Sequence, residues 1–463
     1  MSPAVLLRAW TGVCACLLQS LPVLPQWESV NGGVSHAVRA FWLDEAHDRL
    51  LVSGSFPFVQ NGELRVNNLA WWDGDSWSAD GLAGGNGNQS EFGNIDPVLS
   101  VAIRDDTLFV GHLGNQWHDA TELAYATMLV NGEWRPCAQA NGTLWFLETN
   151  GRMFSGGVHD SLYNEYAPGI YEWRAGSYGT ITNMPFDSEI GVYDVAYWQG
   201  QYYFGGIFSA FGCTRMVAFD GVDQWSGLGE GVGGNFIETV CGFGDSLYVG
   251  GFFEDGPNVQ SQHIQIWDGA VWKPFFNQVQ FDGAIRDIQV HNGTLYVSGY
   301  HTWANDLTAY GLLRYDGHQL CSIGGPVGGD VGKMAFFHGD LYHSNHYIPG
   351  LEQEWIGRLP LEGLIPDRCV EVGPNAVPDR SSGTYIMTVG PNPASGELHM
   401  QLPTGTYTNA IVILDAIGRE VRTVMIPTSD RSTLAVHDLP PGTYTVQCTA
   451  HGARYFGRFV KQE

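Results

Sequence analysis

A motif that recurs about every 48 residues constrains the fold more than any other feature of this sequence. Each copy is a short apolar strand that ends in two small or polar residues. Seven copies can be aligned, and they end at Gly54, His112, Gly157, Gly206, Gly251, Gly299 and Asn345. The period matches that of a four-stranded propeller blade, a unit that needs neighbours on both sides to bury its apolar faces.

A second signature recurs in phase with the first. It consists of an apolar strand, then Asp-Gly or Asn-Gly, then tryptophan or another large residue, as in Asp73-Gly74 to Trp77, Asn131-Gly132 to Trp134, Asp220-Gly221 to Trp225, Asp268-Gly269 to Trp272 and Asp316-Gly317 to Leu320. These dipeptides predict hairpins with type I′ turns, in which both central residues have positive φ. We expect the tryptophans to fill the space between neighbouring blades.

The two ends of the repeat region are incomplete in complementary ways. The last unit has a third strand near Trp355 to Leu361 but no clear fourth strand, whereas residues 26–33, which include Trp27, resemble an isolated fourth strand. If the N-terminal segment joins the last unit, the ring closes and no long open edge remains. The sequence therefore predicts an all-β chain with a seven-bladed β-propeller over residues 26–364, with six or eight blades as alternatives.

These repeats resemble the galactose-oxidase or kelch-like, delta-60-type propeller repeats of large bacterial surface proteins. The resemblance covers residues 26–364 and implies an architecture. It implies almost nothing about activity.

The C-terminal part of the chain has a different composition. Residues 365–384 are polar and contain proline, which is typical of a linker, and residues 385–463 form alternating strands without tryptophan. This tail resembles a type IX secretion C-terminal sorting domain of the Bacteroidetes, on the motif residues Pro391, Asn392, Pro393, Gly418, Gly442, Tyr444 and Lys461. The resemblance implies a small β-sandwich that the outer-membrane secretion machinery recognises, followed by cleavage and surface attachment. A generic immunoglobulin-like accessory domain is the alternative.

The first 25 residues are typical of an export signal, because one positive charge at Arg8 precedes an apolar stretch. A lipoprotein processing site around Cys16 and an incorrectly assigned start codon are the alternatives. No other apolar run reaches the length that a transmembrane helix needs. We therefore expect a protein that is secreted or held at the outer cell surface, without a transmembrane segment.

Charge and cysteine content exclude several classes of protein. With 22 Lys and Arg against 48 Asp and Glu, the formal net charge is −26, which disfavours binding to nucleic acid or to anionic membranes. Six cysteines follow the export signal without any C-x-x-C pair, which argues against zinc ribbons and thioredoxin-type sites. Their disulfide pairing stays open among 15 full pairings.

Signatures of common enzymes are missing from the sequence. It contains no phosphate-binding loop with Lys-Ser/Thr, no H-E-x-x-H and no G-x-S-x-G. We predict no catalytic residues, no cofactor and no metal site.

The connections between strands suggest where a ligand would bind. Turns between the first and second strands are short and lie on one face of the predicted disc, while longer connections lie on the opposite face, where function tends to reside. The long loops combine histidine with aromatic and acidic residues, namely Trp117, His118, Asp119, His159, Asp160, Tyr163, His301, Trp303, His346 and Tyr347. Two interpretations fit these ten residues: loop packing with solvated surface, which the residue types alone favour, and a glycan- or metal-binding rim.

The leading hypothesis is a surface propeller that binds a glycan, a peptide or a protein partner through its long-loop face. A polysaccharide-acting enzyme, either a hydrolase or a lyase, is the alternative, and a purely structural module is a third possibility. A buried pair of acids with an arginine on the long-loop face would favour the enzyme. A shallow aromatic rim without such a pair would favour binding.

Overall fold

The structure is a computed structural model of the whole chain. It describes residues 27–82, 89–90, 97–118, 121–138, 142–159, 161–162, 165–166, 170–181, 191–253, 262–275, 281–301, 303–304, 307–308, 311–325, 332–344, 351, 354–371, 384–386, 388–391, 394–401, 410–414, 420–425, 431–450 and 453–462. Within these residues no helix has the length and apolar character needed to cross a lipid bilayer.

The larger part of the chain consists of four-stranded antiparallel units. The first unit pairs β2 (Val38–Asp44), β3 (Arg49–Gly54), β6 (Leu69–Trp72) and β7 (Trp77–Ser78) in that order. Counted as one blade each, the units in the described part of the chain number seven. The others are β9 (Val98–Arg104), β10 (Thr107–His118), β11 (Thr121–Val130) and β12 (Glu133–Pro136); β13 (Thr143–Thr149), β14 (Arg152–Val158), β17 (Tyr171–Arg174) and β18 (Ser177–Thr180); β19 (Gly191–Trp198), β20 (Gln201–Ala210), β21 (Cys213–Phe219) and β22 (Trp225–Gly227); β23 (Phe236–Phe243), β24 (Ser246–Phe252), β25 (Ile264–Trp267) and β26 (Trp272–Pro274); β27 (Ile285–His291), β28 (Thr294–Gly299), β31 (Leu312–Tyr315) and β32 (Gln319–Ser322); and β33 (Met334–Phe337), β34 (Asp340–Ser344), β35 (Ile356–Pro360) and β1 (Glu28–Ser29).

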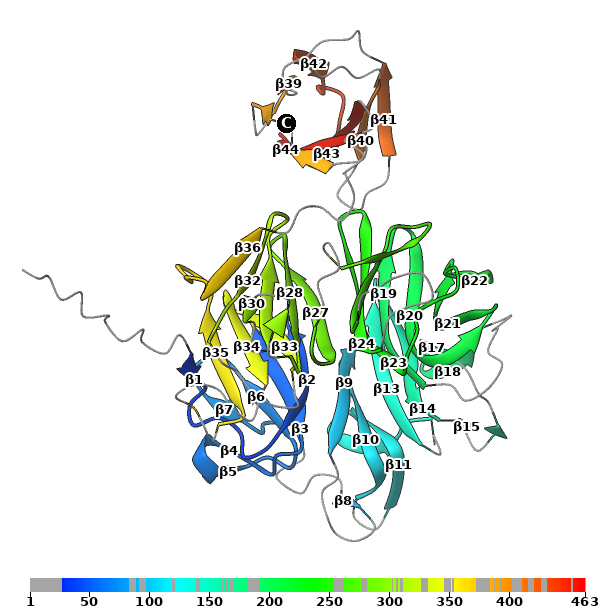
Figure 1. Ribbon diagram of the computed structural model, residues 1–463, viewed down its shortest axis with the longest axis vertical. Helices are drawn as coiled ribbons and strands as arrows, with labels where there is room; N and C mark the ends of the chain where they lie inside the picture. The colour runs from blue at the N-terminus through cyan, green and yellow to red at the C-terminus, as the bar shows by residue number, and fades with distance from the viewer. Residues whose placement is uncertain are drawn as a thin grey trace, which may run out of the picture.

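The blades form a closed ring, so this part of the chain is a β-propeller. The first strand of each blade contacts the first strand of the next, and β33 in the last blade contacts β2 in the first. In Figure 1 the blades follow one another from blue to yellow, and β1, in dark blue, lies beside the yellow strands. Glu28 pairs with Arg358 and Ser29 with Gly357 on β35. The N-terminal strand therefore completes the last blade, as the sequence predicts.

The Asp-Gly hairpins are present, but the predicted turn type is wrong at most of them. At Asp73, Asp220, Asp268 and Asp316 only the following glycine has positive φ. In the first of these turns Oδ1 of Asp73 accepts hydrogen bonds from the backbone N–H groups of Asp75 and Ser76, at 2.9 and 2.7 Å. The carboxylate thus organises a longer loop, which a two-residue type I′ turn would not need. Asn131-Gly132 does form the predicted type, with φ of 51° and 80°.

The stretches predicted as long loops contain additional strands. β10 and β11 extend to His118 and Thr121 and pair there, so residues 116–118 and 121–124 continue the hairpin. Extended residues gain ladder hydrogen bonds in this way, which an irregular loop would leave to water. The other short elements are β4 (Phe58–Val59), the 3-10 helix η1 (Gln60–Gly62), β5 (Leu64–Arg65), β8 (Gln89–Ser90), β15 (Ser161–Leu162), β16 (Glu165–Tyr166), β29 (Trp303–Ala304) and β30 (Leu307–Thr308).

The stretch predicted as a linker begins with a strand. β36 (Arg368–Glu371) pairs with β32 as a fifth strand on the outer edge of the sixth blade. Cys321 and Cys369 face each other in this pairing and form a disulfide. Residues 368–371 therefore belong to the propeller, because both backbone pairing and a covalent bond hold them there.

The C-terminal part is a β-sandwich, as the sequence predicts. One sheet has the order β37 (Thr384–Ile386), β44 (Ala453–Lys461), β43 (Gly442–Ala450), β40 (Ala410–Leu414) and β41 (Glu420–Met425), and the other has the order β38 (Thr388–Gly390), β39 (Glu397–Gln401) and β42 (Arg431–Ala435). Apolar side chains from both sheets, including Leu398, Ile413, Leu434, Val446 and Phe459, form one core. Figure 1 shows this sandwich outside the ring of blades.

Candidate functional site

Two histidines of the predicted rim lie in the core of the blades. His159 and His301 are only 7% and 3% exposed. Both stand two residues after the glycine that ends the repeat motif, and the same position holds the buried residues Phe56, Phe208 and Phe253 in other blades. His301 packs edge-on against Phe281, with ring centroids 5.1 Å apart. These two histidines therefore take the place of a core phenylalanine and do not form part of an exposed rim.

Three other predicted rim residues lie in strands. The backbones of Trp117 and His118 lie in β10, and that of Trp303 lies in β29. Asp119, Asp160, Tyr163, His346 and Tyr347 lie outside the described residues.

The inner strands of the ring carry a recurring β-bulge near their N-terminal ends. In β2, β9, β19, β23 and β27 the pairing with the second strand skips one residue, and these extra residues are Arg39, Leu99, Tyr193, Glu238 and Arg286. A bulge adds an unpaired residue and redirects its side chain. Since the inner strands begin at the long-loop face, four of these five bulges place large polar side chains at that end of the central channel, and the fifth places Leu99 there.

In four blades the residue after the bulge links the blade to the next one. Side-chain oxygens of Ser100, Asp194, Thr239 and Asp287 accept hydrogen bonds from backbone N–H groups on the following inner strand, at 2.9, 2.8, 3.2 and 2.8 Å. The donors are Phe146, Val240, Ile288 and Met334. These bonds give the polar residues in the repeat a structural role, because they satisfy backbone groups that face the channel.

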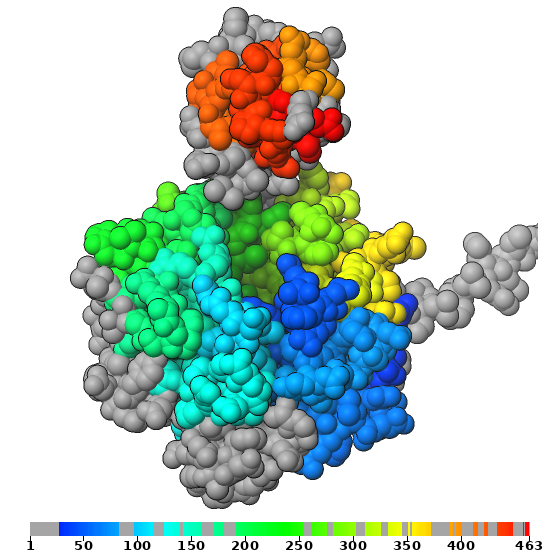
Figure 2. Space-filling model, turned by 180° about the vertical axis from the view of Figure 1, so that it is seen from behind, coloured from blue at the N-terminus to red at the C-terminus, as the bar shows by residue number. Residues whose placement is uncertain are grey.

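A cavity of about 500 Å³ occupies the centre of the ring. Figure 2 shows the ring hollowed between the blue first blade and the cyan and green blades. Every inner strand or the residue just before it contributes to the lining, through residues such as Arg39, Ser100, Trp145, Tyr193, Glu238, Arg286 and Lys333. The cavity is therefore the central channel of the propeller.

Charged groups of both signs lie buried or half-buried in this channel. Burial raises the pKa of Asp194 to about 6, although hydrogen bonds from Val240 and Val195 and the charge of Lys333 oppose the shift. Burial likewise raises the pKa of Asp287. Arg286 pairs with Glu238 at 2.5 Å, and Nζ of Lys333 donates to the carbonyl oxygen of Arg286 at 2.8 Å.

Aromatic side chains form a continuous row beside the channel. Successive ring centroids lie 5.0 Å apart between Trp145 and Tyr193, 5.7 Å between Tyr193 and Phe236, and 6.1 Å between Phe236 and Phe252. We call these four residues the aromatic crescent. Trp145 and Tyr193 also line the cavity, so the crescent begins inside the channel and ends on the surface.

An exposed apolar residue recurs in the same position of five successive blades. Directly after the glycine or histidine that ends the repeat motif stand Leu113, Val158, Ile207, Phe252 and Tyr300, which are between 42% and 59% exposed. The second strands run toward the long-loop face, so these side chains lie around the channel mouth. Exposed apolar side chains that gather on one surface mark interaction sites more often than isolated ones do. Alignment of the repeats could have identified them, since the position is fixed by the motif.

Two buried polar atoms of the channel lining lack a hydrogen-bond partner in the described structure. They are Nε1 of Trp145 and Oε2 of Glu148. Burial raises the pKa of Glu148, and the charge of Arg104 only partly offsets this. Within the described residues, no group of three or more His, Cys, Asp and Glu side chains is placed to hold a metal ion.

The tail residues predicted from the sorting motif lie in and around the sandwich core. Tyr444 is buried, stacks on Phe459 and donates to the carbonyl oxygen of Pro440 at 2.9 Å. Gly442 pairs with Lys461 at the ends of β43 and β44, and the Lys461 side chain is buried. Pro391 is exposed, whereas Asn392, Pro393 and Gly418 lie outside the described residues.

The ring and the sandwich together define a β-propeller protein with a C-terminal β-sandwich domain. Residues 381–462 match the family described as the secretion system C-terminal sorting domain, which agrees with the motif in the tail. The chain is therefore exported, to the cell surface or into the medium. No curated protein matches this sequence significantly.

Two solved structures are weakly similar to the chain. An ancestral GH74 enzyme has a TM-score of 0.38 at 11% identity, over 93% of this chain and 63% of that one. A mutant levansucrase from B. megaterium has a TM-score of 0.23 at 10% identity, over 63% of this chain and 81% of that one. Both scores are too low to support an argument about fold or activity.

Proposed function

We propose that the propeller, once exported, binds a glycan at the long-loop mouth of its central channel. The aromatic crescent carries this proposal, because it presents ring surfaces that lead into a cavity with charged and hydrogen-bonding groups. Sugar rings stack their apolar faces on aromatic side chains, while their hydroxyl groups need polar partners. Trp145 Nε1 and Glu148 Oε2 offer an unused donor and an unused acceptor in the same cavity.

The five exposed apolar residues around the mouth extend the contact surface. Phe252 belongs both to this set and to the crescent. A chain of sugars would reach from Phe252 toward Tyr193 and Trp145, with its end in the channel. A peptide or protein partner is the competing ligand, because the same apolar side chains would contact it.

Glycan-array binding of the full chain tests this proposal. Tyr193→Ala and Phe252→Ala should each weaken a positive glycan signal at least about tenfold, the scale of removing one aromatic stacking contact. Tyr197→Ala is the matched control, because Tyr197 is 41% exposed and lies at the opposite end of β19. Unchanged binding in both crescent variants, or equal loss in the control, would refute the assignment.

One observation supports an enzyme as the second candidate function. Asp194 and Asp287 are two buried acids with raised pKa values near Arg286 and Lys333, which is the arrangement that would favour a hydrolase or a lyase. Their hydrogen bonds to the next blade favour a structural role instead. Release of reducing ends from polysaccharides by the full chain, abolished in Asp194→Asn or Asp287→Asn while glycan binding persists, would establish the enzyme.

A further inference from the structure

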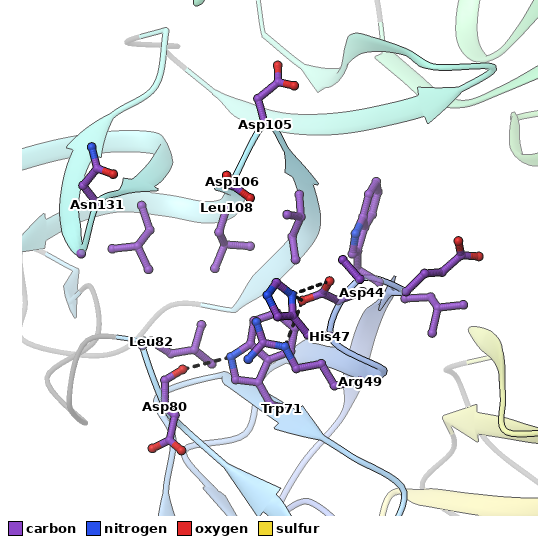
Figure 3. Close-up of a pocket in the computed structure, with 18 residues that line it drawn as sticks. Asp44, His47, Arg49, Trp71, Asp80, Leu82, Asp105, Asp106, Leu108 and Asn131 are labelled. Atoms are coloured by element: carbon purple, nitrogen blue, oxygen red, sulfur yellow. Dashed lines mark hydrogen bonds and ion pairs between the residues drawn. The ribbon is translucent and has the colours of Figure 1, made fainter.

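A second hollow lies between the first and second blades, away from the channel mouth. Its volume is about 700 Å³, and it is bounded by the β2–β3 and β9–β10 turns and by residues that follow β7 and β11. These tight turns lie on the face opposite to the long loops. We call this hollow the interblade groove, and Figure 3 shows Asp44, His47 and Arg49 on one of its sides and Asp105 and Asn131 on the other.

The floor of the interblade groove is apolar. Trp71, Leu82 and Leu108 are buried there, and they belong to a single core cluster that Trp42 and Leu129 join. The half-buried Trp42 and Leu129 therefore offer indole and aliphatic surface at the base of an open groove. An apolar ligand group that settled on it would gain the free energy of leaving water.

The walls of the groove are strongly acidic. Carboxylates of Asp44, Glu45, Asp80, Asp105 and Asp106 line it, against the guanidinium of Arg49 and the imidazole of His47. Arg49 and His47 are both engaged by Asp44, each at 2.9 Å. Burial of Asp44 opposes ionisation, but the hydrogen bonds from His47 and Arg49 outweigh it and hold the pKa of Asp44 below its ordinary value.

The other carboxylates of the groove walls have few cationic partners. Within the described residues no ion pair is formed by Glu45, Asp80 or Asp106, and Asp105 reaches only Arg104 at 3.9 Å. The groove thus presents negative potential above an apolar floor. This combination complements a ligand that is cationic and apolar at once.

The protein itself shows how a guanidinium fits this groove. The guanidinium carbon of Arg49 lies 3.6 Å from the centre of the Trp71 ring, while its Nε donates to Asp44 at 2.9 Å. A planar cation between an indole face and a carboxylate combines stacking with a charged hydrogen bond. Lysine would supply the charge without the planar stacking surface.

We propose that the interblade groove binds a short arginine-containing segment of a partner protein. Its apolar side chains lie against the half-buried Trp42 and Leu129, and its guanidinium groups meet the wall carboxylates. A second copy of this chain is disfavoured as the occupant, because its net charge of −26 repels the acidic walls.

The test uses the purified full chain and a fluorescein-labelled peptide of alternating arginine and leucine. Fluorescence anisotropy should detect binding that weakens with added salt, as screening of exposed charges requires. The double variant Asp105→Asn with Asp106→Asn should bind about fourfold more weakly, since exposed ion pairs contribute modestly. Asparagine suits both positions, which have φ of 48° and 56°. A peptide of alternating lysine and leucine should bind more weakly than the arginine peptide.

The matched control removes the same charge elsewhere. Asp223→Asn with Asp245→Asn changes two exposed turn residues of other blades, and Asp245 occupies the same turn position as Asp106. This control should bind the peptide as the unchanged chain does. Equal weakening in the two double variants would reduce the effect to long-range attraction by the net charge and would overturn the proposal. So would undiminished binding by the Asp105 and Asp106 variant, or a lysine peptide that binds as tightly as the arginine peptide.

Discussion

The indole Nε1 of Trp27 donates a hydrogen bond of 2.5 Å to the carbonyl oxygen of Gly324, across 297 residues of sequence. Two other outer-strand tryptophans make the same bond to the blade before them, Trp77 to Val30 and Trp272 to Leu228, both at 2.7 Å. Gly324 has φ of 78°, and a Cβ atom there would lie 2.9 Å from the Trp27 ring. The ring is thus closed by the same type of tryptophan hydrogen bond that joins other neighbouring blades.

Removal of the Trp27 side chain should loosen the closed ring. Trp27 is 4% exposed and packs with Leu341 and Leu359, so Trp27→Ala should lower the free energy of unfolding by about 3–5 kcal/mol. Urea unfolding measures the change. Glu28→Gln in the same strand removes only a partly exposed ion pair with Arg358 and should cost less than about 1 kcal/mol. Similar values for the two variants would mean that the ring does not depend on this closure.

Acid should destabilise the propeller through its buried histidines. Burial lowers the pKa of His301 to about 4 and that of His343 to about 3. In the unfolded chain both take up a proton near pH 6.5, so the folded state loses stability as the pH falls below that value. For His301 alone the loss between pH 8 and pH 5 is about 2 kcal/mol. The raised pKa of Asp194 acts in the opposite direction below about pH 6.

His301→Phe isolates this effect, because phenylalanine occupies the corresponding buried position at Phe56, Phe208 and Phe253. We expect the variant to lose about 2 kcal/mol less stability than the unchanged chain between pH 8 and pH 5. Urea unfolding at the two pH values gives the difference. His318→Phe is the control, since His318 is exposed in a hairpin turn. An identical pH response of His301→Phe and the unchanged chain would contradict the prediction.

The disulfide should hold the start of the tail on the sixth blade. Cys321 and Cys369 are 48 residues apart, so the closed loop stabilises the fold by roughly 4 kcal/mol in the chain-entropy treatment. Cys369→Ser should therefore lower the unfolding free energy by up to this amount and expose residues 368–371 to limited proteolysis. Cys213→Ser, at a buried cysteine without a disulfide, is the comparison. Protection of β36 in Cys369→Ser equal to that in the unchanged chain would show that its backbone pairing suffices.

The repeat predicts the ring because its apolar strand and its tryptophan hairpin are fixed by core packing. Closure by Trp27 could also be predicted, because the last blade lacks a fourth strand and the N-terminal segment resembles a fourth strand without a blade. The turn at Asp73 could not be assigned from its two residues alone. Its conformation depends on hydrogen bonds from Asp75 and Ser76 to the carboxylate, and an Asp-Gly dipeptide is compatible with several loop lengths.

The site was harder to predict than the fold. His159 and His301 stand beside polar loop residues in the sequence, and only the repeat alignment reveals that phenylalanine replaces them in other blades. The aromatic crescent joins Trp145, Tyr193 and Phe236 from three blades, so no local pattern could bring them together. The pairing of Cys321 with Cys369 depended on β36, which reads as a polar linker until its partner strand is known.

Loss of the sorting domain should leave a folded propeller in the periplasm. Residues 381–462 match the sorting family, and the sandwich has a core of its own that is separate from the clusters of the blades. Deletion of residues 385–463 therefore removes the export determinant while β36 and its disulfide remain. In a host with type IX secretion, cell fractionation should show the full chain outside the cell and the shortened chain in the periplasm. Tyr444→Phe, which loses only the hydrogen bond to Pro440, should still be exported. Protease resistance of the retained fragment distinguishes a folded propeller from misfolded material, and export of the shortened chain at the level of the full one would disprove the role of the tail.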